Sequence, residues 1–199
     1  MLLGLTGKAG SGKDAVAAYL VKEYNYERRA FADILKRSAA ALLGIDPAEF
    51  EELKNDPTAL VIVDREESRG TYETISKMNV REFLQRYGTE SHREIFGNNF
   101  WVDQLLPKSG FYIGRRIVIP DCRYKTETDR VVSLGGKIVK VSRPTSKIPN
   151  EAYTRHTSEI EQEHLPVDYV LDNSGSLDDL YFEIDRMMVT LKYPPEHYE

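Results

Sequence analysis

Two patterns of apolar and polar positions alternate along the chain: short apolar runs, and longer stretches with helical spacing. The runs predict buried strands at residues 1–5, 26–31, 117–119, 137–142 and 167–173. The helical spacing predicts helices at residues 14–24, 32–44, 46–55, 79–96, 99–106 and 176–191, and one more between Asp121 and Gly135. Residues 56–77 have too weak a pattern to assign an element.

Helix ends carry signals of their own. Asp46 and Ser176 are expected to cap the helices that follow them, because their side-chain oxygens accept the free backbone N–H groups of a first turn. Gly88 lies inside an otherwise helical pattern and is expected to interrupt it, which would place Thr89 and Glu90 at a turn.

Strands that alternate with helices predict an α/β domain with a mainly parallel sheet. The interval of about 33–106 is mostly helical and too long for a simple crossover between two strands. We expect it to be a subdomain inserted beside the sheet, within a single domain that spans residues 1–199.

The composition is that of an ordinary globular protein, with 41% hydrophobic and 30% charged residues among 199. A net charge of −5 argues against a surface that neutralises a nucleic-acid polymer. Cys122 is the one cysteine, so an internal disulfide is excluded, as is typical of a reducing cytosol. The first apolar run ends at Thr6, and no run is long enough for a signal peptide or a membrane span. We therefore expect a cytoplasmic protein without a membrane partner.

The segment Gly7–Lys13, GKAGSGK, has the pattern G-x-x-x-x-G-K between a predicted strand and a predicted helix. In such a loop glycines let consecutive N–H groups turn toward a phosphate chain, and the helix N-terminus adds positive potential. Lys13 then reaches the β- and γ-phosphates of ATP. The alternative is a glycine-rich turn without a ligand. The candidate ATP-binding residues here are Gly7, Ala9, Gly10, Ser11, Gly12, Lys13, Asp14 and Ala15.

Asp14 stands where such loops usually carry a serine or threonine whose hydroxyl contacts magnesium. Mg²⁺ prefers oxygen ligands and keeps several waters, so a carboxylate here would bind the ion directly or hold one of its waters. The alternative is an acidic first-turn residue favoured by the helix dipole.

Four further motifs accompany the SGKD of this loop: FADILK at Phe31–Lys36, LQRYGTE at Leu84–Glu90, IPDCRYKTETD at Ile119–Asp129, and HTSE at His156–Glu159. In this order they resemble the deoxynucleoside monophosphate kinases of tailed bacteriophages, a branch of the P-loop kinases, over nearly the whole chain. The resemblance implies a three-layer P-loop kinase fold with a helical monophosphate-binding insertion and a short lid at about 143–165. It also implies a host-cytoplasmic location if the chain is phage-encoded. Ala15 departs from the threonine that often follows the aspartate in that family.

The FADILKR segment offers an acceptor site. Asp33 lies three and four residues before Lys36 and Arg37, so these side chains share one face of a helix. In a kinase of this kind a cation here would hold the acceptor phosphate, while Asp33 contacts the sugar or orients the attacking oxygen. The alternative is a surface ion pair.

The LQRYGTE region is implied by the resemblance to line the monophosphate site, with Arg86, Glu90 and Arg93 as candidate contacts. The alternative has Glu82–Arg86 and Glu90–Arg93 as solvated helical pairs. The predicted insertion at about 33–106 also contains aromatic residues that would either stack on a base or form the core of the insertion: Tyr72, Phe83, Tyr87, Phe96, Phe100 and Trp101.

Asp121 ends an apolar strand, and open α/β sheets bind ligands beyond the carboxyl ends of their strands. We expect it to anchor magnesium or its waters beside the acceptor, and a plain turn residue is the alternative. Arg123 would point toward the phosphates, and Glu127 would orient it.

The polar segment after the strand 137–142 is bracketed by Arg143 and Arg155. In kinases of this kind such a segment closes over the donor and brings arginines to the transferring group. His156 has no metal-ligand partners at suitable spacing, so it is expected to bond a substrate or cap a helix. The DNSGS segment at 172–176 would contact the adenine or cap the last helix.

The preferred hypothesis is a deoxynucleoside monophosphate kinase that uses Mg²⁺ with ATP, with Lys13, Arg123, Arg143 and Asp33 as catalytic residues. Its partners would be ATP and a (deoxy)nucleoside monophosphate, and the chain a monomer or homodimer. One alternative is a P-loop kinase with dephosphocoenzyme A or phosphomevalonate as acceptor. The other is a regulatory ATPase, which would need a water-positioning glutamate that does not stand beside Asp121.

Overall fold

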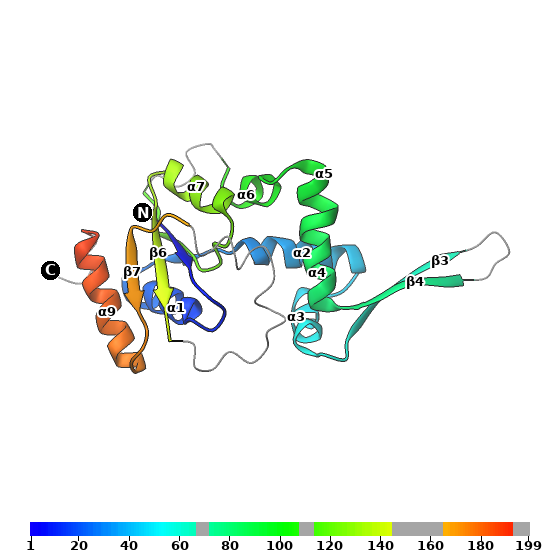
Figure 1. The fold of residues 1–199 in the computed structure, drawn as a ribbon, viewed down its shortest axis with the longest axis horizontal. Coiled ribbons are helices and arrows are strands. Elements are labelled where there is room, and N and C mark those ends of the chain that lie inside the picture. Colours follow the sequence, from blue (N-terminus) through cyan, green and yellow to red (C-terminus); the bar gives the residue numbers. More distant parts are fainter. Residues whose placement is uncertain (67–71, 108–113, 145–164, 193–199) are drawn as a thin grey trace. The chain divides into compact units, whose positions relative to one another are not determined.

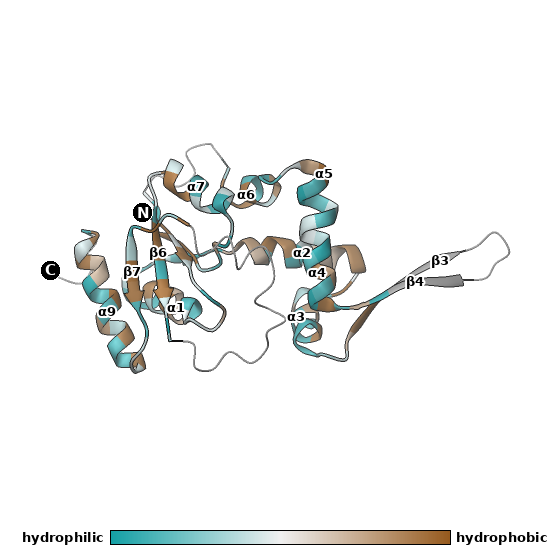
Figure 2. Cartoon of the chain, viewed as in Figure 1, coloured by the Kyte–Doolittle hydropathy of each residue, from teal (hydrophilic) through white to brown (hydrophobic). Residues whose placement is uncertain are grey.

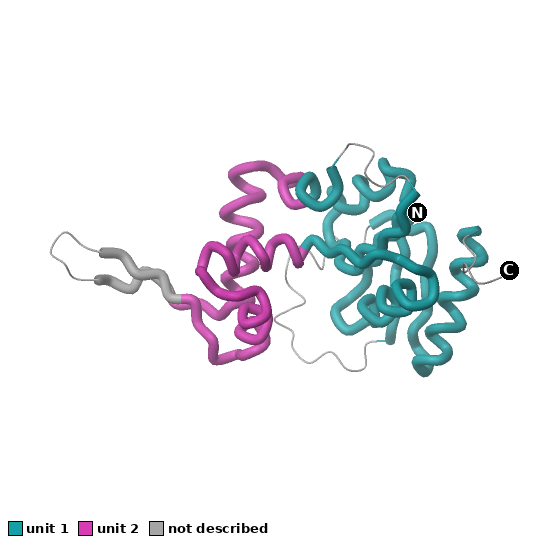
Figure 3. Tube along the Cα trace, turned by 180° about the vertical axis from the view of Figure 1, so that it is seen from behind, with its two compact units in different colours: residues 1–31, 102–199 teal, residues 32–101 magenta. Residues whose placement is uncertain are grey.

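The computed structural model describes residues 1–66, 72–107, 114–144 and 165–192, and the chain divides into two compact units (Figure 3). Unit 1 combines residues 1–31 with 102–199, and unit 2 is residues 32–101. Within the described ranges, no helix is both long and apolar enough to cross a membrane.

Unit 1 is built on a five-stranded sheet in the order β2-β5-β1-β6-β7 (Figure 1). Every neighbouring pair is parallel, so the predicted parallel sheet is confirmed. Its strands are β1 (Leu2–Thr6), β2 (Glu27–Arg28), β5 (Ile117–Ile119), β6 (Lys137–Ser142) and β7 (Tyr169–Asp172).

Helices cover both faces of this sheet, which is why its central strands are buried apolar runs. On one face, α1 (Lys13–Tyr24) and α9 (Leu177–Thr190) form a common core with alternate residues of β1, β6 and β7. On the other face α7 (Lys125–Ser133) packs on β1, where a Cβ at Gly4 would crowd Cys122 and Ile138 and contact Val131 of α7. Figure 2 shows apolar residues concentrated on the strands of unit 1, while α9 carries both apolar and polar residues. The unit therefore has three layers.

The carboxyl ends of four parallel strands meet at one edge of the sheet. The G-x-x-x-x-G-K loop follows β1, Asp121 follows β5, Arg143 follows β6 and Asn173 follows β7. Ligands of open α/β sheets bind beyond this edge, so the fold by itself marks it as the place to look for a site.

Unit 2 is mostly helical and has its own core, formed around Ala39, Ala40, Phe50, Val80 and Leu84. Along the chain it contains α2 (Phe31–Leu43), α3 (Pro47–Asn55), β3 (Leu60–Glu66), β4 (Tyr72–Asn79), α4 (Val80–Gly88), the π-helical turn η1 (Thr89–Arg93) and α5 (Glu94–Phe96), with α6 (Phe100–Leu105) at the boundary to unit 1.

Two features of unit 2 differ from the sequence predictions. Residues 60–66 and 72–79 pair as antiparallel strands, although the sequence predicts no element at 56–77. The expected break at Gly88 is wrong, because Gly88 has helical dihedrals and the helix continues through η1. A side chain at Gly88 would lie 3.2 Å from Leu35, so the glycine serves close packing rather than a turn.

In unit 1 the strand predicted at 26–31 is shorter, since only Glu27–Arg28 pair and α2 begins at Phe31. The two predicted caps are confirmed. Asp46 accepts the Ala48 N–H at 2.8 Å, and Ser176 accepts the Asp179 N–H at 3.2 Å.

Candidate active site

The loop after β1 is shaped by glycines that have no room for a side chain. Gly7 has φ 138° and Gly12 φ 102°, in the left-handed region that favours glycine. A Cβ on Gly7 would overlap the Val141 carbonyl oxygen, and one on Gly12 would overlap Nδ2 of Asn173. The loop is therefore held tightly between the ends of β6 and β7.

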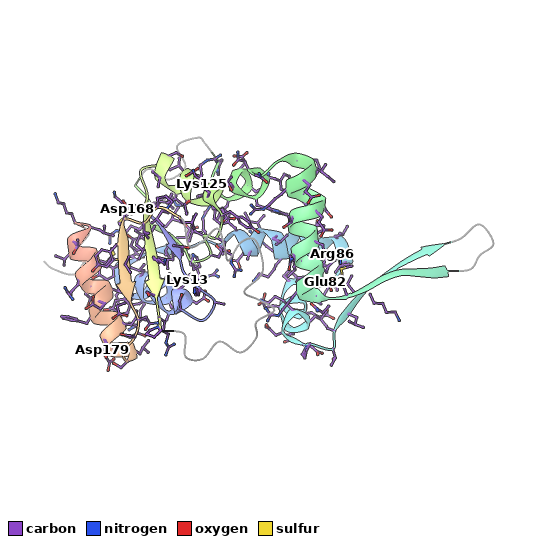
Figure 4. The ribbon with its side chains drawn as sticks, viewed as in Figure 1. Lys13, Glu82, Arg86, Lys125, Asp168 and Asp179 are labelled. Carbon is purple, nitrogen blue, oxygen red and sulfur yellow. The ribbon has the colours of Figure 1, made fainter. Side chains whose placement is uncertain are left out.

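Lys13 is the first residue of α1, and its side chain folds back over the loop (Figure 4). Its Nζ donates to the Gly7 carbonyl at 2.6 Å and to the Lys8 carbonyl at 3.0 Å. The ammonium group is thus held by the backbone of the loop that it would serve.

Two buried hydroxyls lie at the same place. Oγ1 of Thr6 and Oγ of Ser11 have no hydrogen-bond partner among the described residues, although both residues are at most 3% exposed. Buried polar atoms in native proteins nearly always have a partner, so these hydroxyls fit a loop that takes a polar ligand.

The acidic residues expected to serve magnesium lie at the same edge of the sheet. Asp14 is exposed in the first turn of α1, and Oδ1 of Asp121 accepts the Phe31 N–H at 3.1 Å. In the described part of the chain, no cluster of three or more His, Cys, Asp or Glu side chains suits a metal. Mg²⁺ that arrives on nucleotide phosphates needs only one or two protein carboxylates, so the donor set fits it.

Glu127 organises the turn that carries Arg123. Its side chain is only 2% exposed, and Oε2 accepts the N–H groups of Arg123 at 2.7 Å and of Tyr124 at 3.1 Å. Glu127 therefore orients the backbone at Arg123, whose side chain is exposed. Neighbouring Cys122 is buried, and burial raises the pKa of its thiol well above the ordinary value.

Arg143 is exposed directly after β6. Arg155 and His156, with most of the expected lid, lie outside the described residues. Unit 1 thus collects the loop, Asp14, Asp121, Arg123 and Arg143 at or beside one sheet edge.

The acceptor candidates of α2 form a network that includes a residue not expected from sequence. Nζ of Lys36 lies 3.5 Å from Asp33 and 2.8 Å from Glu51 of α3, and Glu51 also pairs with Lys54. Nε of Arg37 donates to the Asp33 carbonyl at 3.3 Å. Burial raises the pKa of Glu51, but the hydrogen bonds and charges of Lys36 and Lys54 outweigh it and hold the pKa below the usual value.

Arg86 of α4 pairs with Glu82 at 2.9 Å, and both side chains are about half exposed (Figure 4). Glu90 and Arg93 belong to η1, where Glu90 is exposed and Arg93 half-buried. Arg93 follows Arg86 by seven residues, a spacing that stacks side chains on one face of a continuous α-helix. The π-helical turn between them adds a residue and so rotates Arg93 away from that face.

Aromatic side chains of unit 2 gather around His92, which sequence reasoning missed. The centroid of its ring lies 4.4 Å from the ring centroid of Tyr87, 5.1 Å from that of Phe100 and 4.8 Å from that of Trp101. Nδ1 of His92 donates to the Tyr87 carbonyl at 2.6 Å, and Nε1 of Trp101 donates to the Gly88 carbonyl at 2.9 Å. The side chains of His92 and Trp101 thus donate hydrogen bonds to backbone carbonyls at the junction of α4 and η1. The side chain of Tyr72 lies outside the described part.

A third residue that the sequence analysis does not single out is Asn173, whose Nδ2 donates to the Ser11 carbonyl at 2.8 Å. The DNSGS motif contains this asparagine, but its pattern predicts an adenine contact or a helix cap. Ser176 is the cap.

A parallel sheet with helices on both faces and a G-x-x-x-x-G-K loop between β1 and α1 define a P-loop kinase fold. Comparison with solved structures agrees. Dephospho-CoA kinase from Campylobacter jejuni superposes with a TM-score of 0.53 over 96% of both chains, at 14% identity, which shows the shared fold alone.

The family model for deoxynucleotide monophosphate kinase matches residues 51–184, and the chain belongs to this family. A protein of Acanthamoeba polyphaga mimivirus, provisionally named a deoxynucleotide monophosphate kinase, is 28% identical over 92% of this chain and 94% of its own length. The deoxynucleotide monophosphate kinase of Escherichia phage RB69 is 26% identical over 58% of this chain and 49% of its own.

Proposed function

We propose that the protein transfers the γ-phosphoryl group of ATP to the phosphate of a deoxynucleoside monophosphate, giving the diphosphate and ADP. The observation that carries this proposal is the glycine loop with Lys13 folded over it, in a chain that belongs to this kinase family. A loop of this shape offers backbone N–H groups and an ammonium group to a triphosphate.

The chemistry requires positioning and charge stabilisation rather than a strong base. An oxygen of the acceptor phosphate is already anionic at neutral pH; it attacks the γ-phosphorus, and the bond to the β-phosphate oxygen breaks to release ADP. Lys13, Arg123, Arg143 and Arg155 would offset the charge of the transferring group. Mg²⁺, held by Asp14 and Asp121 directly or through water, would neutralise charge on the phosphates.

Unit 2 is the proposed acceptor-binding insertion, and residues 143–165 are the proposed lid. Lys36 and Arg37 would contact the acceptor phosphate, with Asp33 on the sugar or the attacking oxygen. Arg86, Glu90 and Arg93 complete the proposed acceptor set. Lys36 supports this assignment because two carboxylates share its ammonium group, and a dianionic phosphate is a stronger competitor for it than either.

The test is ADP formation by the full chain with MgATP and each of the common deoxynucleoside monophosphates. Reactions without acceptor, with dephosphocoenzyme A and with phosphomevalonate run in parallel. We expect strong stimulation by at least one deoxynucleotide and none by the other two acceptors. Turnover that is indifferent to every acceptor would instead favour an ATPase and contradict the proposal.

A further inference from the structure

Asn173 bonds two segments that are distant in sequence. It directly follows β7 and is buried, with 7% exposure. Its Nδ2 donates to the Ser11 carbonyl of the glycine loop at 2.8 Å, and its backbone N–H donates to the Ser142 carbonyl at the end of β6 at 2.7 Å. One residue therefore ties the loop to the ends of two strands.

The contact with the loop is steric as well as polar. Any side chain on Gly12 would overlap Nδ2 of Asn173, so the loop backbone lies directly against the carboxamide. At the other end of the loop, a side chain on Gly7 would overlap the Val141 carbonyl oxygen to the same extent. The loop is thus enclosed between β6 and Asn173. Because the Asn173 carboxamide contacts the loop backbone directly, a substitution at Asn173 would alter the packing at Gly12.

The hydrogen bond also sets the direction of a backbone donor. The peptide between Ser11 and Gly12 is planar and trans, so its C=O and N–H point in opposite directions. Because Asn173 holds the Ser11 carbonyl, it turns the Gly12 N–H away from β7. A loop that binds phosphate depends on N–H groups held in such fixed directions before the ligand arrives.

We infer that Asn173 is a positioning residue for the donor site: it holds the glycine loop in the conformation that binds the triphosphate of ATP. The inference rests on the proposed function, since it presumes that the loop receives a nucleotide. The neighbouring polar residues have local roles. Ser174 bonds to Asp172, while Ser176 and Asp179 cap α9.

The experiment compares Asn173→Ala, Asn173→Asp and Ser133→Ala in the full chain. Ser133→Ala is the matched control, because it removes a side-chain hydrogen bond to the Arg130 carbonyl at the end of α7, which does not reach the loop. Asn173→Asp keeps the size of the side chain against Gly12 but places a carboxylate against the Ser11 carbonyl. For each variant the Kd for MgADP is measured by calorimetry, with KM for ATP and for the acceptor, and the unfolding temperature.

We expect both Asn173 variants to raise the Kd for MgADP and the KM for ATP about tenfold or more, as loss of one buried hydrogen bond requires. The KM for the acceptor should change less than about twofold, and Ser133→Ala should match the wild type. A merely structural role would lower the unfolding temperature without this split between the two substrates. If Asn173→Ala does not fold, the same comparison of Kd and KM values is made with the isosteric variant Asn173→Asp.

Wild-type nucleotide affinity in a folded Asn173 variant would overturn the inference, and so would an equal rise in both KM values. The outcome is separable from that of the proposed function. If the wild type binds MgADP but phosphorylates no deoxynucleotide, the kinase proposal fails while the comparison of Kd values still tests Asn173.

Discussion

The two units hold their candidate sites in different ways. In unit 1 buried groups fix the backbone around the site: glycines against the ends of β6 and β7, Asn173 on the Ser11 carbonyl, and Glu127 on two N–H groups. The charged side chains that this backbone carries, such as Asp14 and Arg123, are exposed. In unit 2 the candidate groups are side chains joined in exposed or half-exposed ion pairs, such as Lys36–Glu51 and Glu82–Arg86.

This difference matters for catalysis. Buried, hydrogen-bonded groups cannot reorient at low cost, so the donor site of unit 1 is preorganised for charge that develops during transfer. Exposed ion pairs contribute only about 0–1 kcal/mol each, so a phosphate can displace one partner easily. Changes in unit 1 should therefore have large effects, and changes in unit 2 small ones that fall on the acceptor.

The largest effect is expected for Lys13→Ala, which removes a side-chain cation that is fixed on the loop backbone. Loss of a preorganised charge-stabilising donor typically lowers kcat by roughly 10²–10³. Steady-state kinetics measure this, with circular dichroism to verify the fold. Lys22→Ala on the same helix is the control, because its side chain is 81% exposed beside Glu23. Normal turnover of the Lys13 variant would exclude the role given to it.

The second prediction separates two glycines of the loop. Both have a left-handed φ, but a methyl on Gly7 would overlap the Val141 carbonyl, whereas Gly10 has open space around it. Gly7→Ala should cost roughly 2–5 kcal/mol of stability, combining backbone strain with overpacking, and Gly10→Ala only roughly 1–2. Urea unfolding measures both. Equal costs would show that the end of β6 does not constrain the loop.

The third prediction concerns the buried carboxylate at α7. Glu127→Ala leaves the N–H groups of Arg123 and Tyr124 without their acceptor, which should cost about 1–3 kcal/mol in unfolding free energy. If Arg123 serves the transferring phosphoryl group, kcat should also fall about tenfold. Asp129→Asn, in the exposed pair with Lys125, should change stability by less than about 1 kcal/mol. A Glu127→Ala variant with wild-type stability but reduced kcat would contradict this prediction, because both losses are attributed to the same two hydrogen bonds.

The sequence predicted unit 1 better than unit 2, for physical reasons. A short buried strand, a glycine loop and a helix that begins directly after the loop are local patterns, so β1, the loop and α1 could be predicted from the first 24 residues. The parallel sheet follows from alternation of strands and helices alone. Unit 2 depends on packing between helices, which explains why the predicted helix break at Gly88 is wrong: the glycine is needed there for close packing against Leu35 of α2.

Contacts between distant residues could not be predicted in either unit. Asn173 and Ser11 are 162 positions apart, and Lys36 and Glu51 are 15 positions apart on different helices. Both pairs are chemically plausible, but so are many others, and only the fold selects them. The pairing of β3 with β4 could not be predicted, because the two strands supply each other's hydrogen bonds and residues 56–77 have too weak a pattern to assign an element.

The smallest expected effect tests the exposed network of unit 2. Glu51→Gln removes the charge that holds Lys36 and Lys54, and at neutral pH it should cost less than about 1 kcal/mol in unfolding free energy. The pKa of Glu51 is lowered in the folded state, so its contribution is present above the ordinary value of 4.5 and is lost as pH falls through the folded pKa. Below that pH, wild type and variant should have the same urea midpoint.

The same substitution has a kinetic consequence that distinguishes the units. If Lys36 binds the acceptor phosphate, loss of its competitor Glu51 should lower the KM for the deoxynucleotide by about two- to fivefold, while the KM for ATP stays unchanged. Glu52→Gln is the matched control, since it makes the same charge change at the next, exposed position of α3. A change in the KM for ATP, or an equal effect of Glu52→Gln, would mean that Lys36 and Glu51 form only a surface ion pair.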